Sequence, residues 1–318
     1  MKSKNLKSNL FKSQWLMLLL ITIIISGFTA IINPKFLMVN NIMNILEQIA
    51  VSGLVAAGAT ILIISGNFDI SVGAIMGLSC CVTAMLITNG IHGIAASMVG
   101  IAVCMLCTLC NGILSIIFKA PSFIITLATT SVYTGISLYT TKGVIQTVYG
   151  QFNFLSATKI LGIPLIFIIS FLGFVLVYLI LKYTQVGRRI FAIGANEKSA
   201  FLSGVKITKN KLIFFVMNGF FVGIAAILLL SRVGSALPSS GSGMEMGAIG
   251  AVVIGGAPIN GGQGNVIGTF FGVLLLGLIS NVLNILGVNP YLQEIASGVI
   301  IIISLGISAI RFRVMSKA

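Results

Sequence analysis

Charged residues are scarce in this 318-residue chain. Only 8% of its residues are Asp, Glu, Lys or Arg, whereas a soluble domain carries about 25%. A globule of this size could not cover its surface with so few charges, which excludes a soluble enzyme, a nucleic-acid-binding protein and a disordered chain. Hydrophobic residues make up 57% of the sequence. This composition predicts an all-α polytopic membrane protein, with a single transmembrane domain over residues 1–318.

Residues that carry catalysis or bind metals are equally few. The chain has one histidine and five acidic residues. A membrane enzyme needs a cluster of histidine, acid or nucleophile, and a secondary transporter driven by an ion gradient generally needs ionisable residues deep in its spans. The acids fall instead at or near segment ends or in loops, at Glu47, Asp69, Glu197, Glu245 and Glu294. Neither class fits the sequence well. Among the possible functions we therefore rank the ion-driven secondary transporter second and the membrane enzyme third.

The five cysteines all lie in apolar runs, at positions 80, 81, 104, 107 and 110. The spacing of Cys104, Cys107 and Cys110 is similar to an iron–sulfur ligand series, but it continues an apolar helical pattern and has no fourth ligand. We interpret all five cysteines as small packing residues.

Only six prolines occur, and none interrupts the interior of a predicted span. The apolar runs predict ten membrane-spanning helices. The eighth is short and rich in glycine, so it either crosses fully or is re-entrant. The ten spans cover residues 15–33, 42–65, 71–89, 94–118, 121–141, 163–182, 211–231, 243–257, 266–287 and 291–310.

The basic residues are distributed unevenly between the two sides that ten spans define. One side has four N-terminal lysines, Lys119, seven basic residues from Lys182 to Lys211, and three at the C-terminus. The other side has only four, Lys35, Lys142, Lys159 and Arg232. Because loops rich in Lys and Arg stay in the cytoplasm, this asymmetry predicts that both termini are cytoplasmic.

The one substantial cytoplasmic loop covers residues 183–210. Asn196 is a good helix N-cap, Glu197 suits the positive end of a helix, and Gly204 suits the position after its end. Together they predict a short helix over Glu197–Ser203, too short to be stable alone in water. The helix therefore rests either on anionic lipid or on a partner protein.

Several ordered blocks of sequence, spread from about residue 40 to 300, resemble the permeases of ribose-type ABC importers. In the cytoplasmic loop they are GRR at 187–189, AIGANE at 192–197 and SGV at 203–205. The stretch GNFDISVGA at 66–74 resembles the family signature GGIDLSVG, with Asn67 in place of a glycine. Further blocks are APSFIITLAT at 120–129, SR at 231–232, AVVIGG at 251–256, GGQG at 261–264 and NILGV at 284–288.

The resemblance implies a ten-helix permease subunit in the plasma membrane of a bacterium, two copies of which pair around a central path. It implies ATPase subunits on the cytoplasmic side, a solute-binding protein outside, and no cofactor in this chain, since ATP and Mg²⁺ belong to the ATPase. The sequence itself has no phosphate-binding Gly-x-x-x-x-Gly-Lys-Ser/Thr loop. The residues that the resemblance assigns to ATPase coupling are Arg188, Arg189, Gly194, Asn196, Glu197, Ala200, Ser203 and Gly204.

The candidates for the transport path are polar residues in or beside the spans, together with Phe123, which belongs to the matching block at 120–129. They are Asp69, Ser71, Ser122, Phe123, Thr126, Asn281 and Asn284. Polar side chains in a membrane face protein or a water-filled cavity. Two alternatives stay open, because Asp69 also suits a helix cap and the asparagines also suit hydrogen bonds between helices. Asp69 and Glu245 each precede a Gly-Ala-Ile segment, which predicts an inverted repeat of spans 2–5 and 7–10.

The transported solute is predicted to be small, neutral and polar, because the spans offer almost no charge. The resemblance favours a monosaccharide such as ribose, and a nucleoside or another neutral solute fits the residues equally. The chain departs from the sugar permeases at Met244-Glu245-Met246-Gly247, where we expect a Tyr-Glu-Leu-Asp series, and 141–162 lacks a Gly-x-Pro turn. These departures affect the prediction of which solute is transported more than the prediction of the fold.

Overall fold

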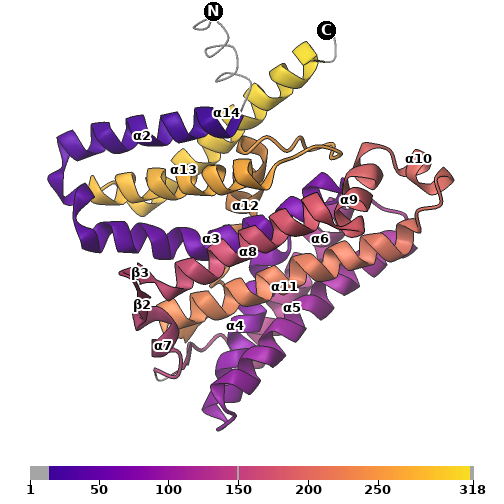
Figure 1. The fold of residues 1–318 in the computed structure, drawn as a ribbon. Helices are drawn as coiled ribbons and strands as arrows, with labels where there is room; N and C mark the ends of the chain where they lie inside the picture. The colour runs from indigo at the N-terminus through magenta and orange to yellow at the C-terminus, as the bar shows by residue number, and fades with distance from the viewer. Residues whose placement is uncertain (1–13, 149, 316–318) are drawn as a thin grey trace, which may run out of the picture.

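The computed structural model describes residues 14–148 and 150–315 and is a bundle of helices (Figure 1). Ten helices correspond one to one to the ten predicted spans, with ends shifted by a few residues. They are α2 Gln14–Ile32, α3 Val39–Ile64, α4 Val72–Thr88, α5 Gly93–Ile117, α6 Ser122–Thr141, α8 Leu165–Tyr183, α11 Ile207–Val233, α12 Met244–Ile254, α13 Val266–Ile285 and α14 Pro290–Met315.

Shorter elements connect these helices. They are η1 Pro34–Leu37, α7 Asn153–Ala157, α9 Gln185–Ala195 and α10 Glu197–Leu202, with four two-residue strands: β1 Gln146–Thr147, β2 Lys159–Ile160, β3 Ile163–Pro164 and β4 Ser235–Ala236. Strand β1 pairs antiparallel with β4, and β2 with β3. We call the end of the bundle that carries α9 and α10 the α10 end, and the end that carries α7, β2 and β3 the α7 end (Figure 1).

Most of these ten helices are long enough and apolar enough to span a membrane. Among the described residues, α2, α3, α5, α6, α8, α11 and α13 are each long and apolar enough to cross a bilayer. Helices α4 and α12 are apolar but shorter, with 17 and 11 residues. The structure therefore confirms an all-α polytopic membrane protein.

The eighth predicted span is a half-helix preceded by an extended segment. After α11 ends near the α7 end, β4 pairs with β1 and residues 237–243 run along α4, where the Pro238 carbonyl contacts Gly77. Helix α12 then leads to the turn at Gly261 and Gly262, which packs on the C-terminal end of α3 at the α10 end. The chain thus runs from one end of the bundle to the other between Val233 and Gly262. Only the second half of this run, α12, is helical.

The helix contacts repeat in two halves. Helix α4 packs on α5 and α6, as α12 packs on α13 and α14. Helix α11 packs on α4 and α5, as α3 packs on α12 and α13. Helices α3 and α11 run in opposite directions and pack on each other. This correspondence agrees with the predicted inverted repeat of spans 2–5 and 7–10.

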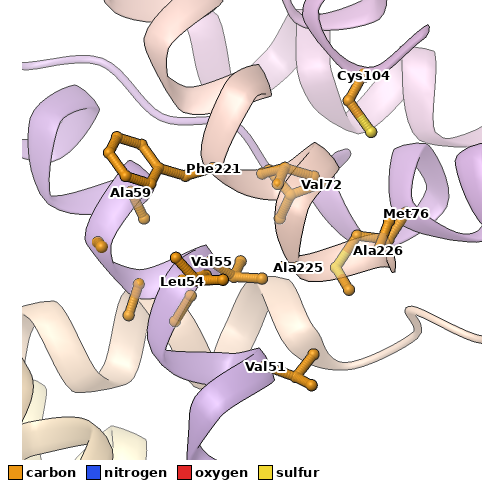
Figure 2. Close-up of a cluster of buried hydrophobic side chains, with 14 of the residues drawn as sticks. Val51, Leu54, Val55, Ala59, Val72, Met76, Cys104, Phe221, Ala225 and Ala226 are labelled. Atoms are coloured by element: carbon orange, nitrogen blue, oxygen red, sulfur yellow. The ribbon is translucent and has the colours of Figure 1, made fainter. Parts of the chain in front are cut away.

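The core lies where α3, α4 and α11 meet. Figure 2 shows Leu54 and Val55 of α3 close to Ala225 of α11, with Met76 of α4 beside them. Glycines let α11 approach α5: a Cβ on Gly219 would lie 2.8 Å from the Cys104 carbonyl oxygen. In a membrane, where apolar burial does not favour one helix contact over lipid, such close packing is a main source of helix association.

The burial of three of the five cysteines agrees with the predicted packing role. All five are free, and Cys80, Cys81 and Cys104 are buried. Cys107 is half-buried and Cys110 is exposed, because the second half of α5 turns that face outward. The described residues include no group of three metal-binding side chains.

The predicted orientation can be tested at the C-terminus. Helix α2 begins beside the end of α12, where the Gln14 side chain donates to the Ile254 carbonyl at 2.7 Å. The lysines before Gln14 and Lys317, which contribute to the charge asymmetry, lie outside the described residues.

We expect an alkaline phosphatase fused after Ala318 to stay inactive, because the enzyme folds only outside the cytoplasm. The same enzyme inserted after Lys159 should be active, and activity at Ala318 would contradict ten crossings.

Candidate coupling segment and transport path

The predicted cytoplasmic loop contains two helices rather than one. Helix α9 begins at Gln185, where the Thr184 hydroxyl accepts a hydrogen bond from the Gly187 N–H at 3.1 Å. Ile190 and Ile193 are buried on one face, and Arg188 and Arg189 are exposed on the other. This amphipathic pattern lays α9 against the ends of the long helices. Both arginines predicted to act in coupling are therefore available to a partner.

Helix α10 begins at Glu197, as the capping pattern predicts. The Asn196 side chain accepts a hydrogen bond from the Ser199 N–H at 2.9 Å. Lys211 of α11 forms an ion pair with Glu197 at 2.7 Å and ties α10 to the bundle. Gly204, at φ +81°, reverses the chain after Ser203.

Helix α10 exposes two large apolar side chains at its C-terminal end. Phe201 is 66% exposed and Leu202 is 76% exposed, whereas Ala200 is buried. Ala200 therefore packs α10 against its own chain, and Phe201 and Leu202 are exposed together with the polar Glu197, Lys198 and Ser199. Two large apolar side chains on a six-residue helix form a small contact site for lipid or for a partner protein.

Gly194 of α9 packs directly against the bundle. We call α9 and α10 together the coupling segment, after their predicted role. A Cβ on Gly194 would collide with the Ile64 carbonyl oxygen and would lie 2.6 Å from the Gly262 nitrogen. The Gly262 N–H in turn donates to the same Ile64 oxygen at 2.8 Å. The ends of α3 and α9 and the turn after α12 thus contact one another through backbone atoms, with no side chain between them. Only glycine fits at position 194.

Asp69 lies in the α3–α4 connection and is buried in a polar network. Its Oδ1 accepts hydrogen bonds from the Ser71 N–H at 3.0 Å and the Ser71 hydroxyl at 2.6 Å. The Asn111 amide of α5 donates to both Asp69 oxygens at 3.3 Å and to the Ser71 hydroxyl at 2.8 Å. The Tyr133 hydroxyl of α6 donates to Asn111 Oδ1 at 2.9 Å. The network joins the α3–α4 connection to α5 and α6.

Ser122 and Thr126 hold the same connection from the other side. The Ser122 hydroxyl accepts from the Phe68 N–H at 2.8 Å, and the Thr126 hydroxyl accepts from the Ile70 N–H at 3.0 Å. Both side chains are buried. The structure therefore brings Asp69, Ser71, Ser122 and Thr126 together and gives each a protein partner.

A polar hollow of about 610 Å³ opens beside these residues at the α10 end. Its lining includes the start of the α3–α4 connection, Lys119 of the α5–α6 turn, and Ser122 and Phe123 at the start of α6. The Glu197–Lys211 ion pair also lines the hollow. Its volume lies within the range of small-molecule sites. Glu197 of α10, the helix predicted to act in coupling, thus lines the same hollow as the predicted path residues Ser122 and Phe123.

Asn281 and Asn284 lie apart from this cluster. The Asn281 and Asn41 amides form a reciprocal pair, with distances of 2.8 and 3.1 Å. The Asn284 Oδ1 accepts from the Gln293 side chain at 3.2 Å. Asn41 is at the start of the 26-residue α3, and that helix spans about 39 Å at about 1.5 Å per residue. Within one chain, the predicted path residues therefore form two groups at opposite ends.

Glu245 lies in the first turn of the half-helix α12, where a carboxylate suits the helix dipole. It contacts the first turn of α4 at Gly73, where a Cβ would collide with the Glu245 carboxylate and would lie 2.6 Å from the Gly241 carbonyl oxygen. The N-termini of the two short helices thus meet at Gly73. Paired half-helix ends of this kind border substrate sites in other transporter folds.

Comparisons with known proteins find sugar permeases among the relatives of this chain. The ribose import permease of Bacillus subtilis is 40% identical over 291 residues, which cover 90% of this chain and 89% of the relative. The ribose import permease of Escherichia coli K12 is 31% identical, with 92% and 94% covered. The D-allose transport system permease of E. coli K12 is 34% identical, with 94% and 91% covered. No solved structure matches significantly.

A family model described as the permease component of branched-chain amino acid transport systems matches residues 41–305. This range includes seven of the ten helices in full and most of α3 and α14, and it leaves out α2. With its bacterial relatives and its membrane-spanning helices, the chain is a multi-pass inner-membrane protein. It belongs to this permease family and is a transport subunit.

Proposed function

We propose that this chain is the membrane-spanning subunit of an ABC importer that passes a neutral monosaccharide, ribose or a related sugar, into the cell. The observation that carries the proposal is the 40% identity to a ribose import permease over about nine-tenths of both chains. The relative named for D-allose extends the same class of solute. The family model is described for amino acids, so an amino acid joins the nucleoside as an alternative cargo.

The polar hollow supports a neutral solute. Its charged lining residues are Lys119, Lys211 and Glu197, and the last two neutralise each other as an ion pair. The rest of the lining is apolar, amide, hydroxyl or backbone. The hollow thus keeps a single net positive charge, on Lys119. A path with so little charge would bind a neutral sugar weakly and let it leave, so affinity would reside in an external solute-binding protein.

The proposal is tested by uptake of radiolabelled ribose in cells that lack their own ribose permease. Expression of this chain together with an ABC ATPase and a solute-binding protein from the same organism should restore uptake, and omission of any one component should abolish it. Competition with unlabelled D-allose, a nucleoside or leucine then identifies the class of solute. Uptake that leucine blocks and sugars do not would overturn the sugar assignment.

In this proposal, α10 docks into an ATPase subunit, as each of two permease copies would do in the assembled importer. A cysteine at Leu202 is expected to form a disulfide cross-link with a cysteine in the ATPase surface, because Leu202 faces outward. A cysteine at Ala200 is the matched control, since that side chain is buried and should not react. Absence of cross-links at both Phe201 and Leu202 in an active complex would favour the lipid-bound alternative.

The path itself is proposed to pass between two copies of the chain and to include the hollow at the α10 end. A cysteine at Phe123, which is 48% exposed and lines the hollow, should react with a water-soluble thiol reagent, at a rate that changes with ATP. A cysteine at Leu172, on the exposed outer face of α8, should not react, because it faces lipid. Equal, ATP-independent rates at both positions would place the path elsewhere.

A further inference from the structure

A small cavity lies between α3, α11 and α12, next to the polar hollow, with which it shares Phe68 as a lining residue. Its volume is about 10 Å³. Five apolar residues line it, Ala59, Leu62, Ile63, Phe68 and Ile249, together with two polar ones, Asp69 and Asn218. The cavity therefore separates a carboxylate of the α3–α4 connection from an amide in the middle of α11.

Asn218 is fully buried, and neither atom of its amide has a hydrogen-bond partner among the described residues. A buried polar group without a partner costs about 1–3 kcal/mol, so a native structure rarely leaves both ends of an amide unsatisfied. Gly58 of α3 packs against the amide, and a Cβ there would lie 2.7 Å from Asn218 Oδ1. The amide is thus held at the cavity wall.

Asp69 also has unused hydrogen-bonding capacity on this cavity. Its Oδ1 accepts three hydrogen bonds, but its Oδ2 accepts only one, at 3.3 Å. That single bond comes from the Asn111 amide, which lies closer to the Ser71 hydroxyl, at 2.8 Å. The ion pairs among the described residues do not include Asp69.

We propose that this cavity binds one ordered water molecule, which donates hydrogen bonds to Asp69 and to Asn218 Oδ1 and accepts one from Asn218 Nδ2. A water site needs about 10–15 Å³ of this kind of volume and two to four polar partners, and the cavity supplies both. A sugar is far too large for it. A divalent cation needs about six or more oxygen ligands, whereas the polar side chains here come from two residues only.

The water would connect the two halves of the molecule. Asn218 lies on α11, which begins directly after the coupling segment, and Asp69 belongs to the network that reaches α5 and α6 through Asn111 and Tyr133. A bridging water bonds nearly as well as a direct contact and tolerates small shifts between the groups that it joins. The bridge therefore lets α11 move relative to the α3–α4 connection while both polar groups stay paired. This inference does not depend on which solute is transported.

Hydroxyl-radical footprinting of the full chain in lipid nanodiscs tests the site, because radicals generated from a bound water modify the side chains beside it. Leu62 and Ile63 are each 1% exposed, so bulk water cannot explain their oxidation. We expect oxidation at these two residues in the native chain and its loss in Asn218→Leu. Thr83→Val, which removes another buried and unpartnered polar atom elsewhere in the fold, should leave it unchanged.

Protection of both residues in the native chain would overturn the proposal, as would equal oxidation in Asn218→Leu. Should Asn218→Leu fail to fold, an experimental density map of the native chain decides the matter alone. A peak within hydrogen-bond distance of the Asn218 amide and Asp69 Oδ2 supports the water. A direct contact between the two side chains that closes the cavity would refute it.

Discussion

Replacement of Gly194 by alanine is expected to abolish ATP-driven uptake while the chain still inserts into the membrane. In an isolated helix this change would stabilise α9 by about 0.5–1 kcal/mol. Here the new Cβ would collide with the Ile64 carbonyl oxygen and approach the Gly262 nitrogen. Because both obstacles are backbone, the coupling segment must move off the end of α3, at a cost of about 1–3 kcal/mol or more.

The measurement is sugar uptake in reconstituted vesicles, normalised to the amount of inserted chain. Gly135→Ala in α6 is the matched control, since a Cβ there meets nothing within 4 Å, and it should transport at the native rate. Native uptake by Gly194→Ala would show that the junction of Ile64, Gly194 and Gly262 does not carry the coupling.

Replacement of Asp69 by alanine is expected to lower the stability of the chain and to stop transport. The change leaves the N–H and hydroxyl of Ser71 and the Asn111 amide without their shared acceptor. Hydrogen bonds to a charged group contribute about 1.5–3 kcal/mol each, so the loss is several times the effect of a surface substitution. Asp69→Asn keeps one acceptor oxygen and should be intermediate.

Thermal unfolding of the detergent-purified chain, followed by fluorescence, measures this loss. The order native, Asp69→Asn, Asp69→Ala is expected for the midpoint temperature, and the same order for uptake. If Asp69→Ala unfolds at the native temperature but does not transport, Asp69 acts on the solute directly and the network is not its main role.

The spans could be predicted from the sequence because apolar length and proline placement are local properties. The same holds for the start of α10, where Asn196 and Glu197 provide the cap within a few residues. Helix α9 was missed because it contains Gly187 and Gly194, which disfavour a helix in isolation. Its helical state depends on packing against the ends of α3 and α8, which no local pattern reveals.

The hydrogen-bond partners of the polar residues could not be predicted from the sequence either. Asp69 suits a helix cap, and its hydrogen bonds to Ser71 agree with that alternative, but its connection to Asn111 and Tyr133 depends on how α5 and α6 pack. Asn281 lies near Asn284 in sequence, yet it pairs with Asn41 of α3, 240 residues away. Residues on one helix face share a direction, and only the tertiary fold determines what they meet.

The central claim is that an external ATPase drives this permease through α9 and α10. It is tested most directly by reconstitution into proteoliposomes with an ABC ATPase and a solute-binding protein from the same organism. Sugar uptake should require all three proteins and ATP, and the binding protein loaded with sugar should stimulate ATP hydrolysis. Uptake should persist when the proton and sodium gradients are collapsed. Uptake by the permease alone, driven by an ion gradient and indifferent to ATP, would contradict the account.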